Sequence, residues 1–179
     1  MTIYIAFLRG INVGGHKLIK MADLRQSLEM MGLRNVQTYI QSGNILFESE
    51  KEASQLAQRI EQQIQTTFGF FVPVMLRTSV EFEQIMENCP FNFDALLENE
   101  SIHISLLSEV PTQKEMTHLD KFQNDVEKYR IEGKEIYLFL SQSIRDSKLA
   151  IQLQKVGVSS TSRNWKTIIK LATKARAME

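Results

Sequence analysis

A glycine-rich loop with cations at both ends is the stretch of this sequence best suited to contact an anion. It reads RGINVGGHK from Arg9 to Lys17. Backbone N–H groups at glycine can approach a phosphate closely. The loop departs from a Walker loop, because His16 stands where lysine is required and Leu18 replaces the serine or threonine. We expect another kind of anion contact or a structural turn. The candidate ligand-binding residues here are Arg9, Asn12, Gly14, Gly15 and Lys17.

A second polar stretch, Tyr39 to Asn44, reads YIQSGN and combines a Ser-Gly turn with four polar side chains. A turn of this kind needs no ligand, since serine and glycine satisfy the local backbone by themselves. The alternative is a polar cluster that hydrogen-bonds a ligand held by the first loop. Its candidate residues are Tyr39, Gln41, Ser42 and Asn44.

A third polar stretch, TSRNWK at 161–166, opens the last predicted helix, with Ser162 as its expected cap. Free N–H groups at a helix N-terminus favour anions. Four cations recur at spacings of three and four and predict one basic stripe along the helix: Arg163, Lys166, Lys170 and Lys174. The alternative is an ordinary solvated face. The candidate ligand-binding residues are Arg163, Asn164, Trp165 and Lys166.

Catalytic and metal-binding patterns are weaker. The histidines at 16, 103 and 118 lack metal-ligand spacing, and no G-x-S-x-G, H-E-x-x-H or C-x-x-C motif occurs. We predict no metal site, name no cofactor and leave open whether the protein is an enzyme. His103 is expected to be a satisfied strand histidine and Cys89 a buried structural cysteine. Tyr137 and Phe139 are expected to pack in a core or interface rather than stack on RNA bases.

The elements that must position these groups follow from hydrophobic periodicity. The order strand, helix, strand, strand, helix, strand occurs twice. In the first half the strands are predicted at 3–8, 36–41, 44–48 and 71–76, and the helices at 21–31 and from 53 to about 69. In the second half the strands are predicted at 102–107, 125–131, 134–140 and 158–161, and the helices from 112 to about 119 and from 149 to 156. Capping boxes are expected at Thr78/Glu81 and Thr112/Glu115.

This repeated order predicts an α+β protein made of two ferredoxin-like (βαββαβ) subdomains in tandem, plus a C-terminal helix. We place the subdomains at 1–78 and 101–179, with a connecting helix and loop at 79–100. In such units the helices cover one sheet face. We therefore expect the other face, with Tyr137 and Phe139 on the second sheet, to pack on the other half or on a partner.

The composition describes an ordinary globular protein of 179 residues, with 21 basic and 21 acidic residues and one cysteine. No disulfide framework and no membrane segment are expected, and we predict a cytoplasmic location. The zero net charge is a cancellation along the chain. Residues 1–47 sum to +3, residues 48–144 to −9 and residues 145–179 to +6. Bulk neutrality therefore does not exclude an anionic partner.

Four blocks taken together resemble a known bacterial family. They are RGINVGG at 9–15, YIQSGN at 39–44, CPF at 89–91 and SRNW at 162–165. In this order they are similar to the signature blocks of the family catalogued as domain of unknown function 1697. The resemblance implies an α+β fold in two ferredoxin-like parts and assigns no activity. Cys89, Ser162 and Lys166 replace the family's usual Asn, Thr and Asn, so any role of those asparagines is absent here.

We therefore predict an uncharacterised cytosolic protein that binds a phosphorylated or other anionic ligand in a basic cleft between the subdomains. A nucleotide or a nucleic acid would suit this chemistry, and no membrane contact is expected. Two alternatives stay open. One is a small-substrate enzyme that uses the same polar loops, with His16, Ser42 or Asn164 moving protons or holding an oxyanion. The other is an interaction module that forms a homodimer through a sheet face.

Overall fold

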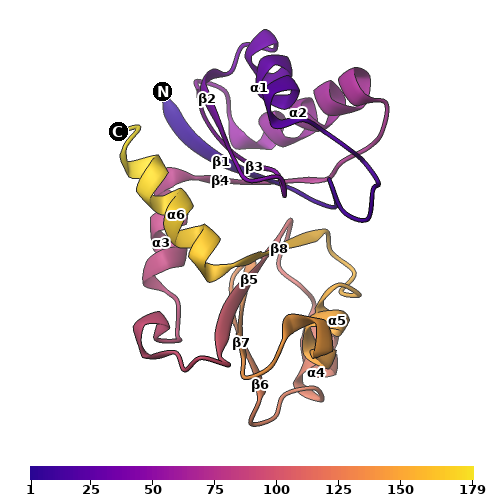
Figure 1. The fold of residues 1–179 in the computed structure, drawn as a ribbon, viewed down its shortest axis with the longest axis vertical. Coiled ribbons are helices and arrows are strands. Elements are labelled where there is room, and N and C mark those ends of the chain that lie inside the picture. Colours follow the sequence, from indigo (N-terminus) through magenta and orange to yellow (C-terminus); the bar gives the residue numbers. More distant parts are fainter. The chain divides into compact units, whose positions relative to one another are not determined.

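Two four-stranded antiparallel sheets and six α-helices make up the fold, as the sequence predicts for an α+β protein. The computed structural model describes residues 1–179 (Figure 1). By its internal contacts the chain divides into one unit of residues 1–84 and 170–179 and a second unit of residues 85–169. The chain passes between the units within two helices, α3 (Ser79–Glu87) and α6 (Trp165–Arg176). The three-part division predicted from the sequence stays a prediction.

The first unit places its four strands in the order β2-β3-β1-β4. Its strands are β1 (Thr2–Leu8), β2 (Arg34–Tyr39), β3 (Asn44–Ser49) and β4 (Val74–Thr78), and its complete helices are α1 (Met21–Met30) and α2 (Ala53–Phe68). Both helices lie on one face of the sheet (Figure 1). There the alternate β1 residues Tyr4, Ala6 and Leu8 join the apolar stripes of the helices in one core.

The other face of β1 is buried as well, as its two apolar faces predict. Ile5 and Phe7 are fully buried. The ring of Phe82, on α3, stacks on Phe7 with 6.0 Å between the ring centroids. At the outer strand, the ammonium group of Lys174 on α6 lies 5.8 Å from the centroid of the Tyr39 ring. The first sheet is therefore covered on both faces, which explains why β1 reads as a continuous apolar run.

The second unit has the corresponding strand order, β6-β7-β5-β8. Its strands are β5 (Ser101–Leu107), β6 (Glu127–Glu132), β7 (Glu135–Leu140) and β8 (Ser160–Asn164), its α-helices are α4 (Gln113–Asp120) and α5 (Lys148–Leu153), and its 3-10 turns are η1 (Phe93–Ala95) and η2 (Ile144–Asp146). Leu107, Ile136 and Leu138 of the sheet form a core with leucines of α4 and α5. On the other face Tyr137 is buried and donates a hydrogen bond of 2.7 Å to the Ile85 carbonyl. This confirms the prediction that Tyr137 packs.

Local signals predict helix starts well. Both expected capping boxes form: the Thr112 hydroxyl accepts from the Glu115 N–H, and the Glu115 carboxylate accepts from the Thr112 N–H. The same pair of bonds joins Thr78 and Glu81. Each box satisfies two backbone donors that a helix start would otherwise leave unpaired.

Several strand boundaries differ from the sequence prediction, among them the start of β4 and the end of β8. β4 begins at Val74, not at residue 71, because Val74 is the first residue registered against Leu8. β8 continues to Asn164, which is registered against His103. The prediction of Ser162 as a helix cap is therefore wrong, since Ser162 lies inside the strand. None of the helices is long and apolar enough to cross a membrane.

Candidate functional site

The loop that follows β1 forms a small hairpin of its own. Val13 and His16 form a bridge in which the His16 N–H donates to the Val13 carbonyl at 3.1 Å. Gly14 and Gly15 between them have φ angles of +61° and +75°. Two successive left-handed residues are what a tight two-residue hairpin turn requires, and glycine adopts them at little cost. The glycines that suggested a phosphate loop thus have a structural reason to be there.

Asn12 holds this loop in place through its side chain. Its amide nitrogen donates to the carbonyls of Ile19, at 3.0 Å, and Gln41, at 2.7 Å. Its amide oxygen accepts from the Ile19 N–H at 2.8 Å. These bonds close the loop at its base and tie it to the 39–44 turn. The structure therefore brings two of the three predicted polar stretches together.

Gly43 completes the junction between the loop and the turn. A Cβ atom at this position would lie 2.7 Å from Cδ1 of Ile11 and 2.8 Å from Cβ of Leu8. Within the turn, the buried Asn44 donates to the Tyr39 carbonyl at 2.9 Å and to the Ser42 hydroxyl at 3.0 Å. Asn44 thus braces the turn from inside. Gln41, whose backbone receives the Asn12 amide, is exposed.

Residues 9–20 carry positive charge that no acidic side chain neutralises. Residues 9–20 contain three lysines or arginines, one histidine and no acidic residue. Arg9 is half-buried, whereas His16, Lys17 and Lys20 are exposed. The ammonium group of Lys17 donates to the Phe71 carbonyl at 2.7 Å, and none of the four forms a salt bridge. The loop is thus a fixed, cationic projection of the first unit.

The third predicted stretch lies in the second unit, and its residues have different surroundings from those expected. Arg163 is a buried strand residue whose guanidinium donates to the Thr161 hydroxyl at 2.8 Å and to the Ser162 carbonyl at 2.9 Å. Burial lowers the pKa of Arg163 to about 10. Trp165 is buried against Tyr137, with ring centroids 6.0 Å apart. The basic stripe predicted along the last helix therefore lacks its first member.

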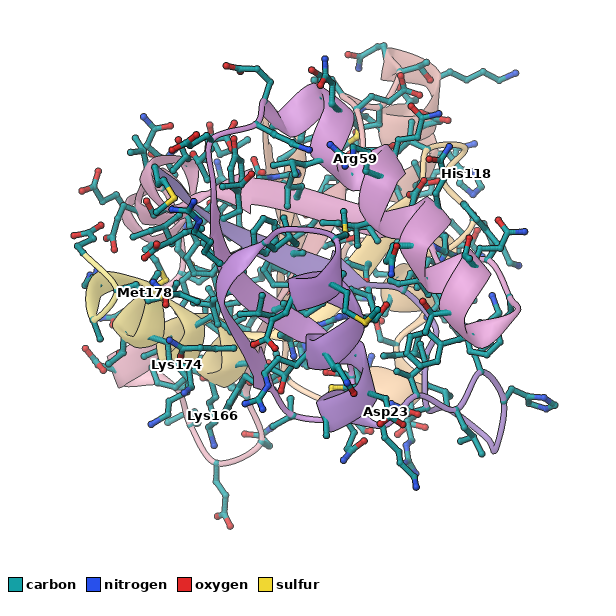
Figure 2. All side chains as sticks on the ribbon, turned by 90° about the horizontal axis from the view of Figure 1, so that it is seen from above. Asp23, Arg59, His118, Lys166, Lys174 and Met178 are labelled. Carbon is teal, nitrogen blue, oxygen red and sulfur yellow. The ribbon has the colours of Figure 1, made fainter.

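Asn164 and Lys166 are the exposed members of this stretch. The Asn164 side chain accepts from the Lys166 N–H at 2.9 Å and so caps α6. Lys166 and Lys174 both project from this helix (Figure 2). The sequence could have indicated this cap, because asparagine is as good an N-cap as serine. The choice between Ser162 and Asn164 depended on where β8 ends.

The remaining histidines and the cysteine have ordinary partners. The imidazole of His103 lies 3.0 Å from the Ser101 hydroxyl, and burial lowers the pKa of His103. Cys89 is half-buried, its thiol donates to the Phe91 carbonyl, and burial raises its pKa. No group of three or more histidine, cysteine or acidic side chains is placed to hold a metal ion.

Sequence reasoning missed a cavity between α4 and α5. It is lined by Thr112, Lys114, Glu115, His118, Gln152, Lys155 and Val156. His118, which projects from α4 (Figure 2), has its Nε2 atom 3.0 Å from the Gln152 side-chain oxygen, across 34 positions of the sequence. The Thr112–Glu115 capping box marked one wall. No local pattern could reveal that α5 would supply the other.

Two helix-covered antiparallel sheets with a cationic, glycine-containing loop after the first strand define a two-unit α+β protein. Within this class, the chain belongs to the family described as "protein of unknown function (DUF1697)", whose model matches residues 1–137. The predicted family resemblance is thereby confirmed, and three of the four sequence blocks lie within the matched residues.

A solved structure extends this similarity to the whole chain. It is that of the conserved bacterial protein SP0830 from Streptococcus pneumoniae, with 28% sequence identity and a TM-score of 0.80. The match covers 97% of this chain and 98% of that chain. None of the curated proteins compared with the chain matches it.

Proposed function

We propose that this protein binds an anionic ligand, a phosphorylated small molecule or a nucleic acid, at the cationic loop of residues 9–20. The turn at 39–44 forms the base of this site. We further propose that each unit is ferredoxin-like. The ferredoxin-like proposal is supported by the strand order β2-β3-β1-β4, which is repeated as β6-β7-β5-β8, and by the order of helices between the strands.

The observation that carries the binding proposal is unbalanced charge on a rigid loop. Three lysines or arginines occur within twelve residues, with no acid among them and no salt bridge to any of them. The Asn12 amide fixes the loop at both Ile19 and Gln41. A site whose shape is set before binding loses less conformational entropy when the ligand arrives. Gly14 and Gly15 are accounted for by the hairpin turn, so they are no evidence for a phosphate site. The positive charge of the loop is what supports the proposal.

The candidate residues Arg163, Asn164, Trp165 and Lys166 play no part in this proposal. Arg163 and Trp165 are buried and Asn164 caps a helix, so these three have structural roles. Lys166 is exposed but belongs to the second unit, whereas the loop belongs to the first. Dimerisation through a sheet face has less support than anion binding, because Ile5, Phe7 and Leu46 of the first sheet are fully buried within the single chain.

The test is to measure the binding of AMP, glucose 6-phosphate and a short single-stranded RNA by calorimetry or fluorescence anisotropy. We expect at least one of them to bind, and we expect Arg9→Gln and Lys20→Gln each to weaken binding by about two- to fivefold, the effect of losing one exposed charge pair. The matched control is Arg59→Gln, which removes the same charge from the exposed side of α2 (Figure 2).

An unchanged affinity in the Arg59 variant, beside weaker binding in the two loop variants, supports the loop as the site. Equal losses in all three variants would show a general effect of net charge and contradict the proposal. Absence of binding by all three probes would contradict it as well.

A further inference from the structure

The cavity between α4 and α5 is a second place where this protein can hold a small molecule, and it lies wholly within the second unit. Its volume is about 470 Å³. This volume is within the range of small-molecule pockets, and the site is partly open to solvent. Val156 is the one apolar residue of the wall, and the aliphatic parts of two lysines add apolar surface beside its polar groups.

The one carboxylate in the wall is already committed to the fold. Glu115 accepts from the Thr112 N–H at 2.8 Å with one oxygen and from the Gly157 N–H at 3.0 Å with the other. These backbone hydrogen bonds lower the pKa of Glu115. A Cβ atom at Gly157 would lie 2.7 Å from the Glu115 oxygen, so a larger residue there would make the Glu115 carboxylate shift.

The other polar groups of the wall are donors with few acceptors among them. Lys114 and Lys155 form no salt bridge. With the Gln152 oxygen as acceptor, the His118 Nε2–H donates to it, so the two N–H groups of the Gln152 amide have no protein partner. The wall therefore holds two lysines against one carboxylate, and the Gln152 amide offers two further donors. A complementary ligand is an anion that brings acceptor atoms.

We propose that this cavity binds a small organic anion in which one carboxylate or phosphate group is attached to an apolar body. The acidic group pairs with Lys114, Lys155 and the Gln152 amide, and the apolar body packs on Val156 and the lysine stems. Neither a cofactor nor a covalent step is involved. This site is independent of the loop at 9–20, which belongs to the other unit.

The experiment is a titration of the full-length, ¹⁵N-labelled protein with benzoate, phenyl phosphate and the neutral benzyl alcohol, followed by ¹H–¹⁵N correlation spectra. We expect saturable shifts at the backbone amides of Glu115 and Gly157 and at the Gln152 side chain with at least one of the two anions, and none with the alcohol. A stronger response to phenyl phosphate than to benzoate identifies phosphate as the preferred group, and the reverse identifies carboxylate.

Two variants make the result specific. Lys155→Gln removes a cation from the wall and should weaken binding by about two- to fivefold. Lys121→Gln removes the same charge from the exposed C-terminal end of α4, outside the wall, and should leave binding unchanged. Equal losses in both variants would overturn the proposal. So would shifts at these amides with the alcohol as large as those with the anions, or no shift with any probe.

Discussion

Gly43 is the residue at which the loop after β1 and the 39–44 turn meet most closely. Its φ angle is +84°, and a Cβ atom would enter the contact distances of both Ile11 and Leu8. Two separate costs would follow from adding a methyl group. One is the steric cost of a left-handed backbone for any residue with a Cβ, and the other is overpacking against neighbours that are themselves buried.

The prediction is that Gly43→Ala lowers the free energy of unfolding by about 2 to 5 kcal/mol, the sum of those two costs. Gly69→Ala is the matched control, because Gly69 has a φ of +86° and nothing within 4 Å of the added Cβ. It should lose only the backbone cost, about 1 to 2 kcal/mol. Urea unfolding of both variants measures the difference, and equal losses would show that the close packing at Gly43 contributes nothing.

At the scale of the element, the junction between β8 and α6 depends on one side chain. Asn164 ends the strand and caps the helix at the same time. We predict that Asn164→Ala costs about 1 kcal/mol of stability, whereas Asn164→Asp, which keeps a capping oxygen, costs much less. Ser162→Ala should change little, because Ser162 is an exposed strand residue. Thermal unfolding of the three variants checks this, and a larger loss in Ser162→Ala would restore Ser162 as the cap.

The same junction shows which parts of the fold the sequence can predict. The capping boxes at Thr78 and Thr112 are local, so each was predictable from four consecutive residues. The end of β8 is set by the pairing of Asn164 with His103, which lies 61 positions earlier in the chain. Ser162 and Asn164 are equally good caps by type, and only this distant partner decides between them.

The candidate site divides in the same way. The charge and turn chemistry of residues 9–20 could be read directly from the sequence. That Asn12 would bond the Gln41 carbonyl could not, because it depends on how the β1 and β3 ends meet. The burial of Arg163 could not be predicted from the sequence either. Arginine is rarely buried, and only the register of β8 on β5 places its side chain on a covered face.

At the scale of the whole molecule, folding redistributes the charges that the sequence segregates. The first unit contains 11 basic and 9 acidic residues, a net charge of +2, and the second contains 10 and 12, a net charge of −2. The basic C-terminal region is shared between the units, since residues 170–179 belong to the first and residues 145–169 to the acidic second. Neither unit therefore carries a strong overall field. Any attraction for an anion must come from local groups such as the cations of residues 9–20.

Because only a few local cations attract the ligand, the affinity for a nucleic acid should depend only modestly on salt concentration. The loop supplies three lysines or arginines, Arg9, Lys17 and Lys20, so it can contact about three phosphates. For a single-stranded RNA we predict that log K falls with log salt concentration with a slope of about −2. Arg9→Gln should make this slope shallower by about 0.7, because one phosphate contact is lost. Anisotropy titrations at several salt concentrations measure both values. A slope steeper than about −4 would require basic residues beyond this loop, and a slope unchanged in the Arg9 variant would place the RNA elsewhere on the protein.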